Sequence, residues 1–147
     1  MPSAKRFRNA FKNARRITFN DSSKFAIFSD CHRGNNSFAD DFAKNKNSYF
    51  HALTHYYKNG FTYCELGDGD ELWENLTFNA IFEAHKNVFQ LLQCFFKEGR
   101  LHRILGNHDM IYANQDYVKK HLYSYKNSAT EREEPLFPGI TFPEALV

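Results

Sequence analysis

The sequence is poor in cysteine and has no long apolar segment. Its three cysteines, Cys31, Cys64 and Cys94, are an odd number and lie far apart without a Cys-x-x-Cys pair, so a disulfide framework is not expected. No apolar run approaches the roughly 20 residues that a transmembrane helix needs, and the basic N-terminus lacks the continuous apolar stretch of a signal peptide. We therefore expect a cytoplasmic protein without a transmembrane segment.

A large excess of charge of one sign is also missing. The formal net charge is +2, which is too small to indicate a protein that binds nucleic acid over its whole surface. In contrast, 42% of the residues are hydrophobic and 16 are Phe. The chain can therefore bury an aromatic-rich core, and its 147 residues are enough for a single domain.

Residues 1–20 form a basic segment without an acidic residue. Within it, Phe7, Ala10, Phe11 and Ala14 recur at the spacing of one helical face. Such a helix could anchor the chain to an anionic surface, contact nucleic acid or act as an organellar targeting peptide. The plainer interpretation, which we favour, is a helix whose Phe face packs on the domain while its basic face is in water.

Hydrophobic patterning predicts an α/β fold with the order β-α-β-α-β. The expected strands are 17–19, 24–28, 61–66 and 101–105, and the expected helices are 42–59 and 78–97. Beyond them we expect a short helix at 117–125, a loop at 127–139, and strand residues at 140–142 and 145–147. The apolar stretch 25–28 is expected to be buried on both faces. This order suits a parallel sheet with right-handed crossovers and flanking helices, in which sites form beyond the carboxyl ends of the strands.

Side chains that bind metal ions follow three of these strands. Asp30 and His32 come after strand 24–28, and on an extended strand end they would point to the same side. Asp68 follows strand 61–66 and has two carboxylate oxygens, which could bridge two ions. Asn107 follows strand 101–105 and offers a neutral amide oxygen. A mixture of imidazole and oxygen ligands suits two divalent ions of Mn, Fe, Zn, Co or Ni.

His108 and Asp109 complete the predicted chemistry. A two-metal centre lowers the pKa of bound water to about 7 and clamps the oxygens of a phosphoryl group. His108 would then protonate the leaving group, and Asp109 would fix the tautomer and orientation of that ring, as carboxylates behind histidines do. We expect metal-dependent hydrolysis of a phosphate monoester, a phosphate diester or a pyrophosphate.

Each cluster also has an interpretation without a metal. An Asp-x-His pair at a strand end is common, and the Gly-Asp-Gly-Asp sequence at 67–70 is more often a turn in which Asp70 binds backbone. Cys31, between two predicted ligands, is interpreted as a packing residue. Five histidines are expected at the surface or in the core, namely His51, His55, His85, His102 and His121. The metal interpretation is favoured because three suitable clusters each follow a strand.

The three clusters resemble the first three motifs of the calcineurin-like metallophosphoesterase family. The motifs are Asp30-x-His32, Gly67-Asp68 and the Gly-Asn-His-Asp sequence at 106–109, and the resemblance covers about residues 24–112. The Glu-Leu-Trp sequence at 71–73 is similar to the branch that contains the UDP-2,3-diacylglucosamine pyrophosphatases. The resemblance implies the N-terminal part of an α/β/β/α sandwich.

The resemblance also implies roles for individual residues. Asp30 and His32 would bind the first ion, Asp68 would bridge, Asn107 would bind the second ion and His108 would be the catalytic histidine. We also expect Arg33 to contact a phosphorylated small molecule, a nucleotide or a lipid-linked substrate, although a solvated basic face explains this arginine equally well.

The family's later histidine motifs are missing after Asp109. No Gly-His-x-His sequence follows, and the chain ends within the apolar run 145–147. We therefore expect a C-terminally incomplete domain with at most four of the metal ligands. The alternative to the enzyme is a truncated or degenerate member without activity, acting as a binding or interaction module.

Overall fold

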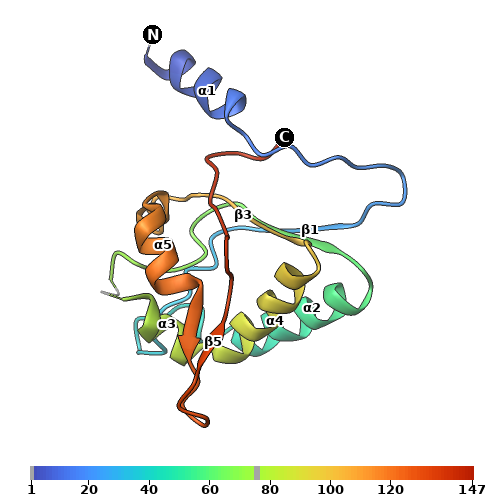
Figure 1. The fold of residues 1–147 in the computed structure, drawn as a ribbon. Coiled ribbons are helices and arrows are strands. Elements are labelled where there is room, and N and C mark those ends of the chain that lie inside the picture. The colour runs from blue at the N-terminus through green and yellow to red at the C-terminus, as the bar shows by residue number, and fades with distance from the viewer. Residues whose placement is uncertain (1, 75–76) are drawn as a thin grey trace.

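A small parallel sheet organises the molecule. The computed structural model describes residues 2–74 and 77–147. The sheet contains β1 (Phe25–Phe28), β2 (Thr62–Glu65) and β3 (Leu101–Arg103) in the order β1-β2-β3, with both pairs parallel (Figure 1). Phe28 lies opposite Glu65, and Glu65 lies opposite Arg103, so the three strands end at the same edge. The predicted α/β class with a parallel sheet and flanking helices is confirmed.

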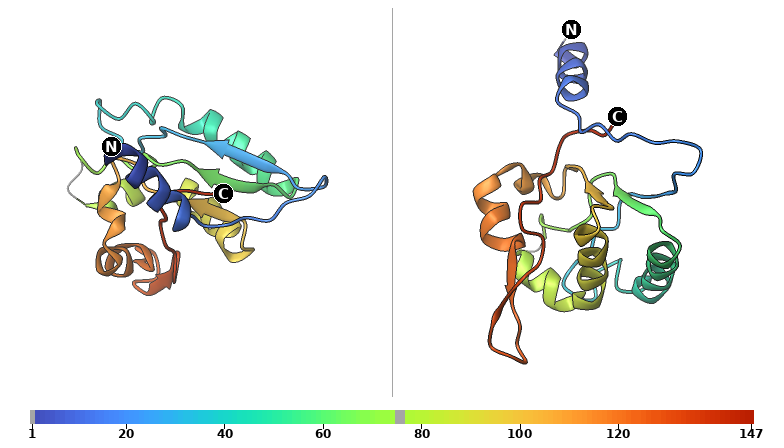
Figure 2. Two further views of the ribbon diagram at one scale, coloured as in Figure 1. Left: turned by 90° about the horizontal axis from the view of Figure 1, so that it is seen from above. Right: turned by 45° about the vertical axis from the view of Figure 1, so that its right-hand side comes forward.

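Helices connect the strands and cover one face of the sheet. α2 (Lys46–Lys58) joins β1 to β2, and α3 (Phe78–Ala84) with α4 (Lys86–Lys97) joins β2 to β3. Figure 2 shows α2 and α4 side by side below the sheet. The predicted helix 42–59 begins later, at Lys46, because residues 41–45 form turns in which the side chain of Asp40 accepts the N–H of Ala43.

The predicted single helix 78–97 is wrong. It is interrupted at His85, whose φ and ψ are −126° and 31°. His85 is fully buried, its Nε2 lies 2.9 Å from Oδ2 of Asp40, and its ring packs edge-on against Phe42. A buried polar ring needs a partner, and this pairing fixes the position at which the two helices meet.

The core between the sheet and the helices is rich in aromatic side chains, as composition predicted. Phe28 packs against Tyr49 and Tyr63, and Phe78 packs against Phe89. The opposite face of β1 is less covered: Ile27 is 63% exposed, so the expectation that this strand is buried on both faces is wrong. Only one face of β1 carries a helix, which explains the difference.

The C-terminal third adds a helix and a hairpin. A 3-10 turn, η1 (Met110–Ala113), leads to α5 (Gln115–Leu122), where Asn114 caps the first turn by accepting the N–H groups of Asp116 and Tyr117. β4 (Ser124–Lys126) then pairs antiparallel with β5 (Glu133–Pro135). The predicted loop 127–139 therefore contains a strand, and the predicted helix 117–125 begins and ends earlier.

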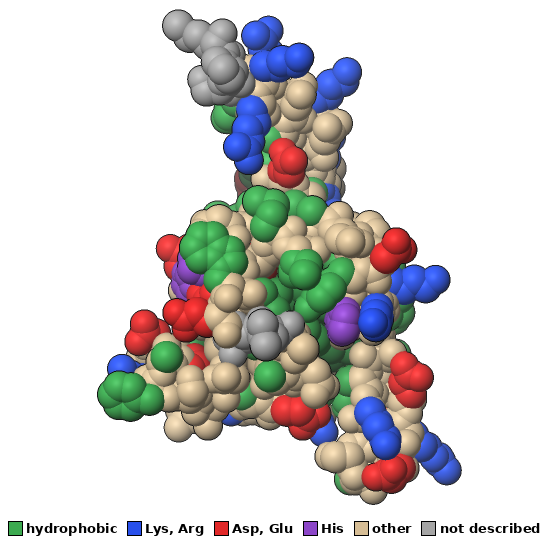
Figure 3. All heavy atoms as spheres, turned by 90° about the vertical axis from the view of Figure 1, so that its left-hand side faces the viewer, with side chains coloured by type: hydrophobic (Ala, Val, Ile, Leu, Met, Phe, Trp, Pro, Cys, Tyr) green, Lys and Arg blue, Asp and Glu red, His purple; other side chains and the backbone are tan. Residues whose placement is uncertain are grey.

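The helix of the basic N-terminal segment stands apart from the rest. α1 (Pro2–Lys12) projects from the body with its Lys and Arg side chains around it (Figures 1 and 3). Phe7 and Phe11 are 73% and 51% exposed, so the expectation that this Phe face packs on the domain is wrong. Among the described residues, no helix is both long enough and apolar enough to cross a membrane.

Residues 15–17 lie parallel to residues 145–147. The N–H of Arg15 donates to Ala145 O, that of Val147 to Arg15 O, and that of Ile17 to Val147 O. The contact between Arg15 and Leu146 is a single bridge rather than a strand pair, and 17–19 and 140–142 are not strands. Of the strands predicted at 17–19, 140–142 and 145–147, only this short parallel pairing is present.

Candidate metal centre

Three loops meet beyond the carboxyl ends of the parallel strands. Asp30 and His32 follow β1, and Asp68 follows β2. Each of the three offers a ligand atom, and these atoms all lie within 4.8 Å of one another. The N–H of His32 donates to the backbone oxygen of Asp68 over 2.9 Å, which fixes the first loop to the second. The structure thus brings together three of the four predicted metal ligands.

These three residues share an unusual backbone conformation. Asp30, His32 and Asp68 have φ of 52°, 48° and 49°, in the left-handed region. Residues other than glycine rarely adopt this region. The backbone strain costs on the order of 1–3 kcal/mol per residue, and residues strained in this way cluster at functional sites. We expected Asp30 and His32 to converge on an extended strand end; they converge instead through left-handed turns.

Two glycines allow the loops after β2 and β3 to touch. A Cβ at Gly106 would lie 2.2 Å from both the backbone N and the Oδ1 of Asp68, and one at Gly67 would lie 2.8 Å from the Cα of Gly106. The N–H of His108 also donates to Oδ1 of Asp68 over 2.7 Å. The backbone of the third loop therefore positions the carboxylate of the second.

The carboxylate of Glu71 lies between two histidine rings. Its Oε2 is 2.9 Å from Nδ1 of His32 and 2.6 Å from Nδ1 of His108, and the two ring centroids are 4.4 Å apart. Trp73 stacks on His108 with a centroid distance of 4.0 Å. Burial alone would raise the pKa of Glu71, but hydrogen bonds from His32 and from the N–H of Glu74 outweigh it and lower that pKa.

No role was predicted for Glu71 from the sequence. The available signal was its position three residues after Asp68, on the same strand-end loop.

Asp109, which we expected to orient His108, makes other contacts. It is buried, and its carboxylate accepts the N–H groups of Gly106 and Gly69 over 2.7 and 3.0 Å. Burial raises the pKa of Asp109. Asp109 therefore holds the backbone of two loops.

Asn107 is the fourth predicted ligand, and it follows β3. It lies in the same loop as His108 and is exposed. Within residues 2–74 and 77–147, its side chain makes no hydrogen bond, ion pair or ring contact.

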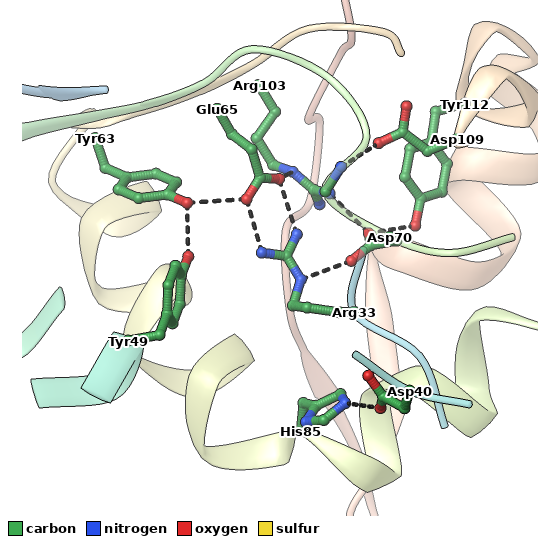
Figure 4. A network of polar contacts seen from close by, with 11 residues as sticks. Arg33, Asp40, Tyr49, Tyr63, Glu65, Asp70, His85, Arg103, Asp109 and Tyr112 are labelled. Carbon is green, nitrogen blue, oxygen red and sulfur yellow. Dashed lines mark hydrogen bonds and ion pairs between the residues drawn. The ribbon is translucent and has the colours of Figure 1, made fainter. Parts of the chain in front are cut away.

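Arg33 does not face the site, so the expectation that it contacts a substrate is wrong. Its side chain is fully buried and forms a two-pronged ion pair with Glu65, with distances of 2.7 and 2.8 Å. Its Nε donates to Oδ1 of Asp70 over 2.8 Å. Figure 4 shows this guanidinium between the two carboxylates.

Arg103 completes a balanced network of two cations and two anions. It lies 2.5 Å from Glu65 and 2.7 Å from Asp70. The Tyr112 hydroxyl also donates to Asp70, over 2.6 Å. Burial would raise the pKa of Asp70, but the charges of Arg103 and Arg33 hold it well below its usual range. The network joins the ends of β2 and β3 to the two loops that carry the ligands.

Two cavities are lined in part by the loop that carries Asp30 and His32. One, of about 440 Å³, is lined by His32, Asp41, Glu71 and Glu74 among others. The other, of about 370 Å³, is lined by Asp30, Cys31 and His32 with residues of the first crossover. The site is therefore accessible to a small molecule.

Comparison with known proteins gives no relative: no protein-family model, no curated protein and no solved structure matches this chain.

Proposed function

We propose that this protein hydrolyses a phosphate ester or a pyrophosphate with divalent metal ions bound at the strand-end loops. The observation that carries the proposal is the convergence of Asp30, His32 and Asp68, with ligand atoms within 4.8 Å and with all three residues in the left-handed conformation. Strained backbone at three neighbouring potential ligands is explained more readily by function than by folding.

The donor set fits a first-row transition ion. Two carboxylates and one imidazole provide the mixed oxygen and nitrogen ligands that Mn, Fe, Zn, Co or Ni bind. Asn107 lies one residue from His108 and is exposed, which suits the remaining predicted ligand. When bound, divalent ions would supply a nucleophilic water at neutral pH and neutralise charge on the phosphoryl group.

His108 is the proposed proton donor to the leaving group. Glu71 lies against its Nδ1, and Trp73 covers one face of its ring. With Nδ1 against the carboxylate, Nε2 is the nitrogen available for proton transfer, and the side chain retains 23% of its exposure. Glu71 thus takes the positioning role that sequence reasoning gave to Asp109.

The proposal extends to the fold and to the substrate. We propose that the parallel sheet belongs to the N-terminal part of an α/β/β/α sandwich, and that the pairing of 15–17 with 145–147 belongs to its second sheet. We further propose a cytoplasmic enzyme that acts on a phosphorylated small molecule, a nucleotide or a lipid-linked phosphate.

The test is hydrolysis of p-nitrophenyl phosphate and bis-p-nitrophenyl phosphate in the presence of Mn²⁺. Asp68→Asn, which tolerates the left-handed backbone, should abolish activity. His108→Gln should reduce it by about 10²–10⁴-fold while the metal content is unchanged. Asp21→Asn, at an exposed residue outside the strand-end loops, is the matched control.

Full activity in Asp68→Asn would show that the assigned centre is wrong. Metal binding without any hydrolysis would instead favour the binding module.

A further inference from the structure

A second group of metal donors overlaps the first. His32, Glu71 and His108 each offer a ligand atom, and these atoms lie within 4.8 Å of one another. The group shares His32 with the set formed by Asp30 and Asp68. It differs from that set because it uses His108 as a ligand, although the proposed hydrolysis uses His108 as a proton donor.

Hydrogen bonds do not satisfy all the ligand atoms of this group. Two imidazole nitrogens approach the same oxygen, Oε2 of Glu71, at 2.9 and 2.6 Å. Nδ1 of His108 is buried and has no partner with hydrogen-bond geometry, despite its closeness to the carboxylate. A buried polar atom left in this way is unfavourable, and a bound cation would satisfy it.

The carboxylate is already aimed at the two rings. Oε1 of Glu71 accepts the N–H groups of Trp73 and Glu74 over 3.1 and 3.3 Å, which orients Oε2 toward the histidines. The N–H of Glu71 donates to the backbone oxygen of the buried Arg33. Ordering this group for an ion therefore costs little additional conformational entropy.

We propose that His32, Glu71 and His108 bind one transition-metal ion as a two-histidine, one-carboxylate site. This donor set binds Zn²⁺, Ni²⁺ and Co²⁺. Ligand atoms that are each about 2.1 Å from an ion lie roughly 3.0–3.4 Å apart in octahedral or tetrahedral geometry. The two distances from Oε2 of Glu71 to Nδ1 of His32 and of His108, 2.9 and 2.6 Å, would therefore have to lengthen by less than about 1 Å.

Occupation of this site competes with the hydrolytic arrangement. It withdraws His32 from Asp30 and Asp68, and it withdraws His108 from proton transfer. Excess Zn²⁺ or Ni²⁺ is thus expected to inhibit any activity that Mn²⁺ supports. The site itself does not depend on hydrolysis, so it can be tested by binding alone.

Trp73 is a built-in reporter, because it is the only tryptophan in the chain and stacks on His108. Binding is measured by calorimetry with Ni²⁺ on the full chain, and Ni²⁺ should also quench Trp73 fluorescence. Losing a carboxylate that only orients a histidine ligand weakens metal binding by about 10–100-fold. Because Glu71 is itself a ligand in this proposal, we expect Glu71→Gln to raise the Ni²⁺ concentration needed for quenching by at least about tenfold. The control Glu83→Gln, at an exposed residue of α3, should leave the quenching unchanged.

Asp30→Asn separates the two groups. The proposal predicts that Asp30→Asn still binds Ni²⁺ and is still quenched, because its change lies outside the Glu71 site. The proposal is overturned if Glu71→Gln binds and is quenched like the wild type, if Asp30→Asn alone removes the effect, or if the wild type binds no Ni²⁺. Circular dichroism of each variant confirms that it is folded.

Discussion

Replacing Asp70 with Asn should test whether the buried ion network supports the site. The substitution keeps the shape of the side chain and removes one charge. Asp70 is fully buried and accepts hydrogen bonds from Arg33, Arg103 and Tyr112. All three partners are donors, so the amide nitrogen of Asn would oppose one of them. Two buried guanidinium groups would then share the single carboxylate of Glu65.

The expected loss follows from this geometry. Removing one partner of a buried ion pair typically costs about 3–5 kcal/mol, because the remaining charge stays buried. A domain of this size has a total stability of only about 5–15 kcal/mol. With about 2–4 °C per kcal/mol for proteins near this length, the melting temperature should fall by roughly 6–20 °C.

Urea denaturation followed by circular dichroism measures the change. Asp41→Asn is the matched control: Asp41 is exposed and 3.8 Å from Lys44, and its loss should change stability by less than about 0.5 kcal/mol. If Asp70→Asn were as stable as Asp41→Asn, the network would not hold the loops, and the reasoning would be refuted.

Further predictions concern pH and a glycine. The neighbouring arginines lower the pKa values of Asp70 and Glu65 against the effect of burial. The stability that these carboxylates contribute is present above their unfolded pKa values of about 4 and is lost as the pH falls further. Acid unfolding of the wild type should therefore depend on pH more steeply than that of Asp70→Asn. Burial lowers the pKa of His85 although the carboxylate of Asp40 opposes this effect. Protonation therefore favours the unfolded state, and the free energy of unfolding should begin to fall below about pH 6.5. A free energy of unfolding that stays constant from pH 7 to pH 5 would contradict this. Gly106→Ala would place a Cβ 2.2 Å from the backbone N of Asp68 in the facing loop, so it should destabilise the protein and weaken metal binding. The control Gly139→Ala has open space around it and a φ of 85°, so it should cost only about 1–2 kcal/mol of backbone strain. Equal effects in the two variants would show that the loop contact is not needed.

Patterning predicted the elements that position the site. The apolar stretches before Asp30, Asp68 and Asn107 are strands, and their parallel order follows from the helices between them. Because parallel strands end at a common edge, the convergence of the first two clusters was predictable without knowing a single contact.

The individual roles of charged residues were less predictable, since they depend on burial. Arg33 follows His32 and resembled a substrate contact, but it is buried against Glu65. In the same way, Asp109 is adjacent to His108 in sequence, whereas Glu71 reaches that ring through the fold. Sequence neighbours in a tight turn often point apart, so adjacency is a poor guide to contact.

Two local features could not be predicted from periodicity. The apolar face of 78–97 continues through His85, and only the tertiary pairing with Asp40 interrupts the helix there. The left-handed conformations at Asp30 and His32 have only a weak sequence signal, because Asp and His adopt this region more often than most residues but do so at few of their positions.

Anomalous diffraction from crystals of the protein soaked in Mn²⁺ tests the central claim most directly. The account predicts an anomalous peak within coordination distance, about 2.0–2.3 Å, of a carboxylate oxygen of Asp30, a ring nitrogen of His32 and a carboxylate oxygen of Asp68. An absent peak, or a peak remote from these three side chains, would contradict the proposal that the strand-end loops form a metal centre.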